Sequence, residues 1–254
     1  MAMPLPGTRG ARLAHAWRAV AGGAWSRGVL AVAIVLVAAA AAAADTLTVT
    51  FRTPDGRTVS AVLHEAAARP APAVVLVPML GRTKDDWQEP AERLAGAGIS
   101  ALAIDLPALA APASAAALTA WHRDVIAAVA WLSGRGDVRA AAIGVAGASL
   151  GANLAAVAAA ADPRVRALAL VSPSLDYRGV RIEAALREYG ARPALLAASR
   201  RDPYAARSVR QLAEDPPGLR EVYWAEAAAH GSALLARDPE AVQRLVEWFQ
   251  RTLG

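Results

Sequence analysis

Short apolar runs alternate with helix-patterned stretches along most of the chain. The apolar runs occur at residues 74–77, 99–104, 142–146, 168–171, 194–198 and 221–224. The helix-patterned stretches occur at about residues 86–97, 115–133, 150–161, 180–190, 204–214 and 239–252. Strands without polar–apolar alternation are buried on both faces, which is typical of a parallel sheet covered by helices. The pattern therefore predicts an α/β fold with a mostly parallel central sheet and helices on both faces.

The region before the first apolar run has a different period. Residues 46–51 alternate between polar and apolar side chains, and residues 58–63 form a second strand-like run. The intervening Pro54, Asp55 and Gly56 are typical turn residues, so this region is predicted to be a β-hairpin. Residues 45–254 show neither a linker nor an internal repeat, which favours one α/β domain that begins with this hairpin.

The N-terminal segment has a pattern of its own. Residues 1–27 are basic, and residues 28–44 form an uncharged apolar run that ends in three alanines before Asp45. Small residues at that point are typical of a signal-peptidase site, and 17 residues is short for a spanning helix. Residues 1–44 are therefore predicted to be a signal peptide, with an uncleaved signal anchor as the alternative. Either would export the domain to the periplasm or the outside of the cell.

Charge and cysteine content exclude several classes of function. The chain has 254 residues, no cysteine and a net charge of +5, with a pI near 10.3. Four unpaired arginines lie in residues 1–44, which leaves 23 basic and 22 acidic residues in the rest. The domain itself is therefore near neutral. It contains no cluster of basic residues of the kind that would indicate a nucleic-acid partner. The absence of cysteine excludes disulfides, thiolate metal sites and a cysteine nucleophile.

One motif carries chemistry. Gly147, Ser149 and Gly151 form G-x-S-x-G between the apolar run 142–146 and the helical stretch 150–161. A sharp turn between a strand and a helix exposes the serine hydroxyl, and glycines allow the close chain approach that such a turn needs. Ser149 is therefore the candidate nucleophile, and a simple Gly/Ala packing turn is the alternative.

In this context the chain resembles an α/β-hydrolase over residues 46–254. The resemblance implies a triad in the order Ser, Asp or Glu, His. Among the four histidines, only His230 follows the last strand on a loop in that order, which makes it the candidate base. Asp202 resembles the usual acid position, Asp176 is the rival acid, and a helix N-cap is the alternative role of Asp202.

An oxyanion hole needs two backbone N–H donors. The resemblance implies that Leu150, directly after the nucleophile, supplies one donor and that the loop after residues 74–77 supplies the other. Many members carry His-Gly-x in that loop, whereas this chain has Pro78, Met79 and Leu80, and Pro78 has no N–H. Leu80 is the predicted second donor, with Met79 as second choice.

The spacing of the last strands bears on the substrate. Only 21 residues lie between Val171, which ends one run, and Pro193, which precedes the next, enough for one short helix but not for a large lid. Without a lid the active site is expected to be open, which favours ester substrates that can enter from solvent. In this respect the chain resembles the compact dienelactone-hydrolase and esterase branch. No phosphate loop, dinucleotide fingerprint or metal-ligand pair is present, so no cofactor or metal is expected.

The predicted function is therefore a serine hydrolase acting on a small-molecule carboxylic ester. A peptidase that uses the same serine motif and a non-catalytic binding protein with the same fold are the alternatives. Contact with a membrane is expected only if residues 1–44 remain uncleaved. The oligomeric state does not follow from the sequence.

Overall fold

The computed structural model describes residues 46–108, 113–214, 218 and 220–254. The predicted export segment at 1–44 lies outside these residues. Within the described part, no helix combines the length and apolar character needed to span a membrane.

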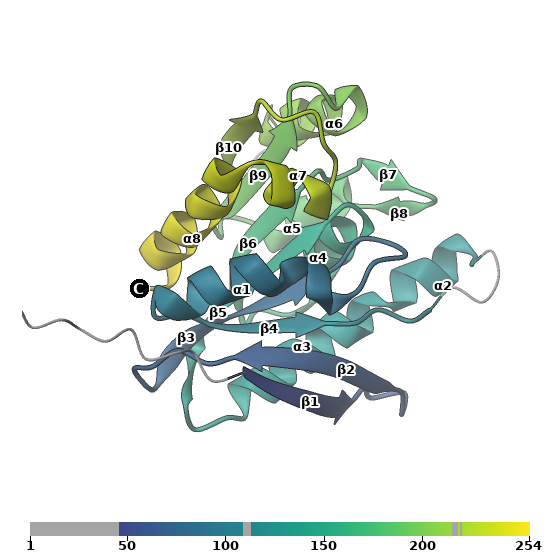
Figure 1. The fold of residues 1–254 in the computed structure, drawn as a ribbon. Helices are drawn as coiled ribbons and strands as arrows, with labels where there is room; N and C mark the ends of the chain where they lie inside the picture. Colours follow the sequence, from purple (N-terminus) through teal and green to yellow (C-terminus); the bar gives the residue numbers. More distant parts are fainter. Residues whose placement is uncertain (1–45, 109–112, 215–217, 219) are drawn as a thin grey trace, which may run out of the picture. The chain divides into compact units, whose positions relative to one another are not determined.

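A single large sheet forms the centre of the domain (Figure 1). Its eight strands lie in the order β1-β2-β4-β3-β5-β6-β9-β10. β1 pairs antiparallel with β2 and β2 antiparallel with β4, whereas the other neighbours are parallel. The predicted mostly parallel sheet with an N-terminal hairpin is therefore confirmed. The strands are β1 Thr46–Arg52, β2 Thr58–His64, β3 Ala71–Val77, β4 Ser100–Ile104, β5 Val138–Ala148, β6 Val165–Val171, β9 Ala194–Ser199 and β10 Arg220–Ala225.

Helices cover both faces of this sheet, as predicted. Helices α1 (Gln88–Gly96), α7 (Ser232–Arg237) and α8 (Pro239–Leu253) contribute side chains to the hydrophobic core on one face. Five helices pack on the other face: α2 Ala115–Ala120, α3 His122–Ser133, α4 Leu150–Ala161, α5 Glu183–Tyr189 and α6 Pro203–Glu214.

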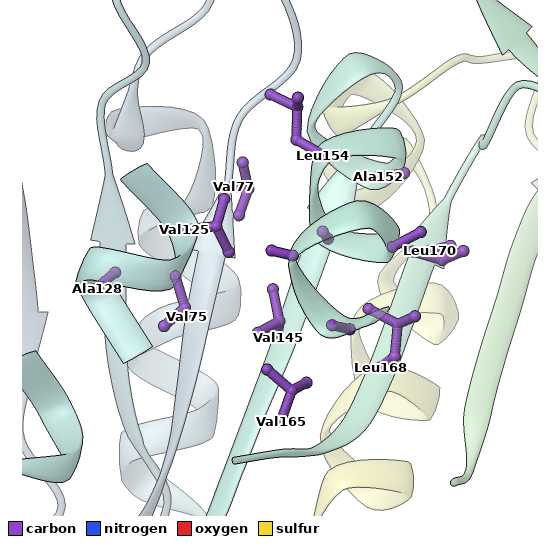
Figure 2. Close-up of a cluster of buried hydrophobic side chains, with 14 of the residues drawn as sticks. Val75, Val77, Val125, Ala128, Val145, Ala152, Leu154, Val165, Leu168 and Leu170 are labelled. Atoms are coloured by element: carbon purple, nitrogen blue, oxygen red, sulfur yellow. The ribbon is translucent and has the colours of Figure 1, made fainter. Parts of the chain in front are cut away.

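The core beside α3 and α4 is built from branched aliphatic side chains (Figure 2). Val75, Val145 and Leu168 from β3, β5 and β6 belong to one buried cluster with Val125 and Leu154 from the two helices. All five are fully buried. Burying such a side chain stabilises the fold by about 1.5–3 kcal/mol, so this layer fixes α4 against the strands.

Two predicted helices differ from the observed elements. The helical stretch 115–133 divides at Trp121 into α2 and α3. The stretch 180–190 begins with a two-residue strand, β8 (Val180–Arg181), which pairs antiparallel with β7 (Asp176–Tyr177). Arg178 and Gly179 between these strands both have positive φ, 49° and 88°, which suits a two-residue hairpin turn.

The segment between β6 and β9 bears on access to the site. It contains only β7, β8 and α5, so no large lid is present there, as expected. The mutually parallel strands β3, β4, β5, β6, β9 and β10 have their carboxyl ends at one edge of the sheet. Loops at that edge are where ligands bind in open α/β sheets.

Candidate active site

Ser149 occupies the sharp turn between β5 and α4. Its φ and ψ are 51° and −117°, a conformation that is costly for a residue with a side chain. Its backbone N–H donates to the Val171 carbonyl oxygen at 2.9 Å. This bond holds the turn against the end of β6.

The two glycines of the motif allow this turn to form. A Cβ atom on Gly147 would lie 2.2 Å from the carbonyl oxygen of Gly151, and one on Gly151 would lie 2.4 Å from that of Val77. Both distances are impossible for real side chains, so only glycine fits at either position. The first turn of α4 thereby packs directly on the backbone that leaves β3.

The structure brings Ser149, His230 and Asp202 together. The His230 Nε2 atom lies 2.8 Å from Ser149 Oγ, and His230 Nδ1 lies 2.5 Å from Asp202 Oδ2. An ionised carboxylate only accepts hydrogen bonds, so Nδ1–H donates to Asp202. Nε2 is then left to accept from the serine hydroxyl, which is the arrangement a general base needs.

Access to the three side chains differs. Ser149 is 5% exposed, and the Asp202 side chain is 14% exposed, whereas that of His230 is 42% exposed. The acid and the nucleophile are thus held within the protein, while the imidazole borders open solvent.

Asp202 also begins α6. Its Oδ1 accepts the Ala205 N–H at 3.2 Å, while Oδ2 faces His230. Pro203 occupies the first helical position, where its missing N–H costs nothing. The N-cap role and the imidazole contact therefore coexist on one carboxylate, and the helix fixes the direction of the acid.

Asp176, the rival acid, is engaged elsewhere. It lies in β7, where its carboxylate accepts from Arg181 Nε at 2.8 Å and from the Gly179 N–H at 2.5 Å. The hydrogen bond from Arg181 lowers the pKa of Asp176 below its ordinary value. The structure thus places Asp202, and not Asp176, on His230.

The candidate oxyanion donors come from two chain segments. Leu150 is the first residue of α4, so its amide is one of the N–H groups at a helix N-terminus. Met79 and Leu80 lie in the loop after β3, which turns at Gly81 with φ of 74° and closes through an Arg82 N–H to Met79 carbonyl bond of 3.1 Å. The choice between Leu80 and Met79 as second donor stays a prediction.

Two contacts join the segment of residues 79–86, which follows β3, to the segment of residues 230–232. The Ser232 hydroxyl donates to the Asp86 carboxylate, which also accepts from Arg82 at 2.8 and 2.6 Å. The hydrogen bond from Arg82 holds the pKa of Asp86 below its ordinary value of 3.8. In addition, a Cβ on Gly231 would lie 2.8 Å from Met79 Sδ, so the two loops are in close contact.

The same region borders an open cavity of about 660 Å³. Met79 and His230 lie on its wall, and α1 and α7 contribute most of the remaining lining. Four carboxylates and one guanidinium line it, namely those of Asp85, Asp86, Glu89, Glu92 and Arg82. Such a volume is within the range of small-molecule sites.

The other two histidines in the domain lie outside this site. His64 ends β2 and is buried, and burial lowers its pKa. The His122 Nδ1 atom lies 2.7 Å from the Thr119 carbonyl oxygen at the start of α3. Within the described residues, no group of three histidine, aspartate or glutamate side chains is arranged to hold a metal ion.

Three side chains of the site did not emerge from the sequence: Ser172, Asp86 and Ser232. Each contacts a segment far away in the chain, with separations of 59 residues for Ser172 and Gly231 and 146 residues for Asp86 and Ser232. No local motif marks them, because their roles arise from tertiary contact.

Comparison with known proteins agrees with this architecture. A family model described as alpha/beta hydrolase fold matches residues 110–220. A search of curated proteins found no significant match.

Solved structures match over most of the chain. A dienelactone hydrolase from Anabaena variabilis is 21% identical with a TM-score of 0.71, over 84% of this chain and 100% of the other. DcsB, solved in complex with its substrate analogue, is 16% identical with a TM-score of 0.72, over 82% and 99%. A Pyrococcus furiosus esterase is 17% identical with a TM-score of 0.67, over 83% and 92%. The family-model match and these solved structures together show that the chain has the α/β-hydrolase fold.

Proposed function

We propose that the protein is a serine hydrolase that cleaves small carboxylic esters with Ser149 as nucleophile. The observation that carries this proposal is the continuous hydrogen-bonded chain from Asp202 through His230 to Ser149, with distances of 2.5 and 2.8 Å. The strained φ of Ser149 supports it, because buried strain is retained mainly at functional positions.

The proposed reaction proceeds in two halves. Ser149 Oγ attacks the ester carbonyl carbon while His230 Nε2 takes the hydroxyl proton, and the carbonyl becomes a tetrahedral oxyanion. Collapse breaks the C–O bond, and His230 returns the proton to the departing alcohol. Water then attacks the acyl-serine with His230 again as base, which releases the acid and regenerates Ser149. Asp202 orients the imidazole and stabilises its charged form.

The oxyanion would be held by backbone amides. The backbone N–H of Leu150 is the proposed first donor, and that of Leu80 is the proposed second donor. The N–H of Met79 is the alternative to that of Leu80. Donors fixed before the reaction need no rearrangement as charge develops, which is why such holes contribute strongly to catalysis.

An accessible ester fits the surroundings of the site. The segment between β6 and β9 contributes only β7, β8 and α5, and the cavity beside His230 is open. The structural neighbours include a dienelactone hydrolase and an esterase by name. We therefore favour a small ester with an accessible carbonyl group, rather than a peptide, as the substrate.

A fluorophosphonate probe tests the proposal directly. The purified full chain should be labelled at Ser149 and should hydrolyse a panel of short-chain esters, and Ser149→Ala should lose both properties while it keeps its fold. A folded wild-type protein that is neither labelled nor active above Ser149→Ala would overturn the proposal and favour a binding protein. Cleavage of peptides but not of esters would favour a peptidase.

We also propose that residues 1–44 direct export of the domain. The support is the basic stretch followed by an apolar run and three alanines before Asp45. N-terminal sequencing after expression in an export-competent bacterium tests this. A mature protein that starts near Asp45 indicates a signal peptide, an intact membrane-bound chain indicates an anchor, and an intact cytoplasmic chain contradicts export.

A further inference from the structure

The carboxyl end of β6 contacts all three segments that carry the proposed triad. The Val171 carbonyl accepts the backbone N–H of Ser149 at 2.9 Å. The next residue, Ser172, donates its backbone N–H to the Ala197 carbonyl in β9 at 2.7 Å. Its Oγ accepts the backbone N–H of Gly231 at 3.0 Å. One dipeptide therefore touches the nucleophile turn, the strand that leads to Asp202 and the loop of His230.

Ser172 itself is buried and has an unusual backbone conformation. It is 1% exposed, and its φ is 50°, in the left-handed region that favours glycine. A glycine would adopt this backbone at lower cost but would lack the hydroxyl. A buried, strained serine whose hydroxyl binds another loop indicates that the hydroxyl is the useful group.

The partner of that hydroxyl is the residue next to the imidazole. The Gly231 N–H is buried, so without Ser172 Oγ it would be left unsatisfied at a substantial cost. On its other side Gly231 is tightly packed, because a Cβ there would lie 2.8 Å from Met79 Sδ and 3.6 Å from Ser149 Cβ. The backbone at Gly231 is thus fixed between a hydrogen bond and a packed side chain, and His230 is one residue away.

We infer that Ser172 is a positioning residue of the proposed triad, whose hydroxyl holds the Gly231 backbone so that His230 Nε2 stays within reach of Ser149 Oγ. This role rests on the proposed function for its effect on catalysis. It does not rest on it for the placement of the imidazole, which can be observed without turnover.

Two variants of the full chain remove the hydroxyl in different ways. Ser172→Ala keeps the strained backbone, whereas Ser172→Gly relieves it, so at least one folded protein is expected. We expect both to lower kcat for ester hydrolysis by about 10- to 100-fold, with KM changed much less. We also expect both to shift or broaden the ¹H and ¹⁵N resonances of the His230 side chain, including the Nδ1–H that faces Asp202.

Ser208→Ala is the matched control. Ser208 is also a buried serine, 1% exposed, and its Oγ accepts the N–H of Leu175 from a distant segment at 3.3 Å. It lies in α6, and its hydroxyl forms hydrogen bonds with Leu175 and Tyr204 rather than with the triad. This variant should lose a comparable amount of stability but keep kcat and the His230 resonances.

The outcomes separate the two proposals. If the wild type hydrolyses esters and the folded Ser172 variants match it in kcat and in the His230 resonances, the role of Ser172 is wrong and the proposed function stands. If the wild type shows neither labelling nor turnover, the proposed function fails. The His230 resonances then decide the positioning role alone: a change in the Ser172 variants but not in Ser208→Ala supports it, and no change overturns it.

Discussion

A Cβ atom on Gly151 would lie 2.4 Å from the carbonyl oxygen of Val77. The first turn of α4 therefore packs against the backbone that leaves β3, with no space for a side chain between them. This contact brings the Ser149 turn next to the loop of Met79 and Leu80. It explains why the second glycine of the motif is needed for the geometry of the site as well as for the turn.

Gly151→Ala should consequently damage both stability and activity. The new methyl group can be accommodated only if α4 and the end of β3 move apart, which we expect to cost about 2–4 kcal/mol of unfolding free energy. Urea unfolding measures this cost, and probe labelling of Ser149 reports the site. Gly136→Ala is the control, because a Cβ there meets open space. Equal stability of the two variants would contradict the packing argument.

Substitution of Ser149 itself should reveal the strain that this turn stores. A residue with a Cβ at φ of 51° and ψ of −117° costs about 1–3 kcal/mol, and glycine avoids most of this cost. Ser149→Gly should therefore be more stable than Ser149→Ala by about 1 kcal/mol, after allowance for the greater entropy of glycine in the unfolded chain. Both variants should lack probe labelling. Thermal or urea unfolding decides, and a less stable glycine variant would argue against strain at this turn.

The predictable part of the site is the part that local sequence determines. The turn at Ser149 could be located because an apolar strand, two glycines and a helix follow one another in the chain. The edge position of Asp202 and His230 followed from strand order, since parallel strands end at one edge of the sheet. The α/β fold followed from the same alternation of apolar runs and helices.

The remaining features depend on short elements or on distant contacts. β7 and β8 contain two residues each, too few for a periodic pattern. The stretch 115–133 has helical composition throughout, so nothing in its pattern marks the division at Trp121. Likewise α7 is only six residues long and follows Gly231, whose φ is 60°. Ser172 and Asp86 acquire their roles only once β6, α7 and the 3₁₀ helix Lys84–Trp87 are packed in three dimensions.

The choice between the two candidate acids leads to a paired experiment. Asp202→Asn should lower kcat for esters by about 10³- to 10⁴-fold, because an amide cannot hold the imidazole in the required tautomer or stabilise its charged form. Asp176→Asn should change kcat little, since the Asp176 carboxylate binds Arg181 and the Gly179 N–H. Steady-state kinetics on both variants measure the difference. A large loss in Asp176→Asn together with an active Asp202→Asn would reverse the assignment.

The ion pair between Arg82 and Asp86, which the Ser232 hydroxyl supports, should make stability depend on pH. Hydrogen bonding from Arg82 and Ser232 lowers the pKa of Asp86 in the folded protein. An acid with a lowered folded pKa stabilises the fold above its unfolded pKa, and this contribution is lost as the pH falls through the folded value. The unfolded value is ordinarily about 3.8, so the contribution should be complete above about pH 5.

Asp86→Asn isolates this contribution, because asparagine can still accept from Ser232 but carries no charge. We expect the wild type to exceed the variant in unfolding free energy by about 1 kcal/mol or less near pH 7, since Arg82 is largely solvent-screened. The difference should shrink as the pH falls below 4, as measured by urea unfolding at a series of pH values. Glu240→Gln, which breaks an exposed i,i+4 pair with Arg244, should have little effect near pH 7. A wild-type advantage that grows on acidification would contradict a lowered pKa at Asp86 and its ion pair with Arg82.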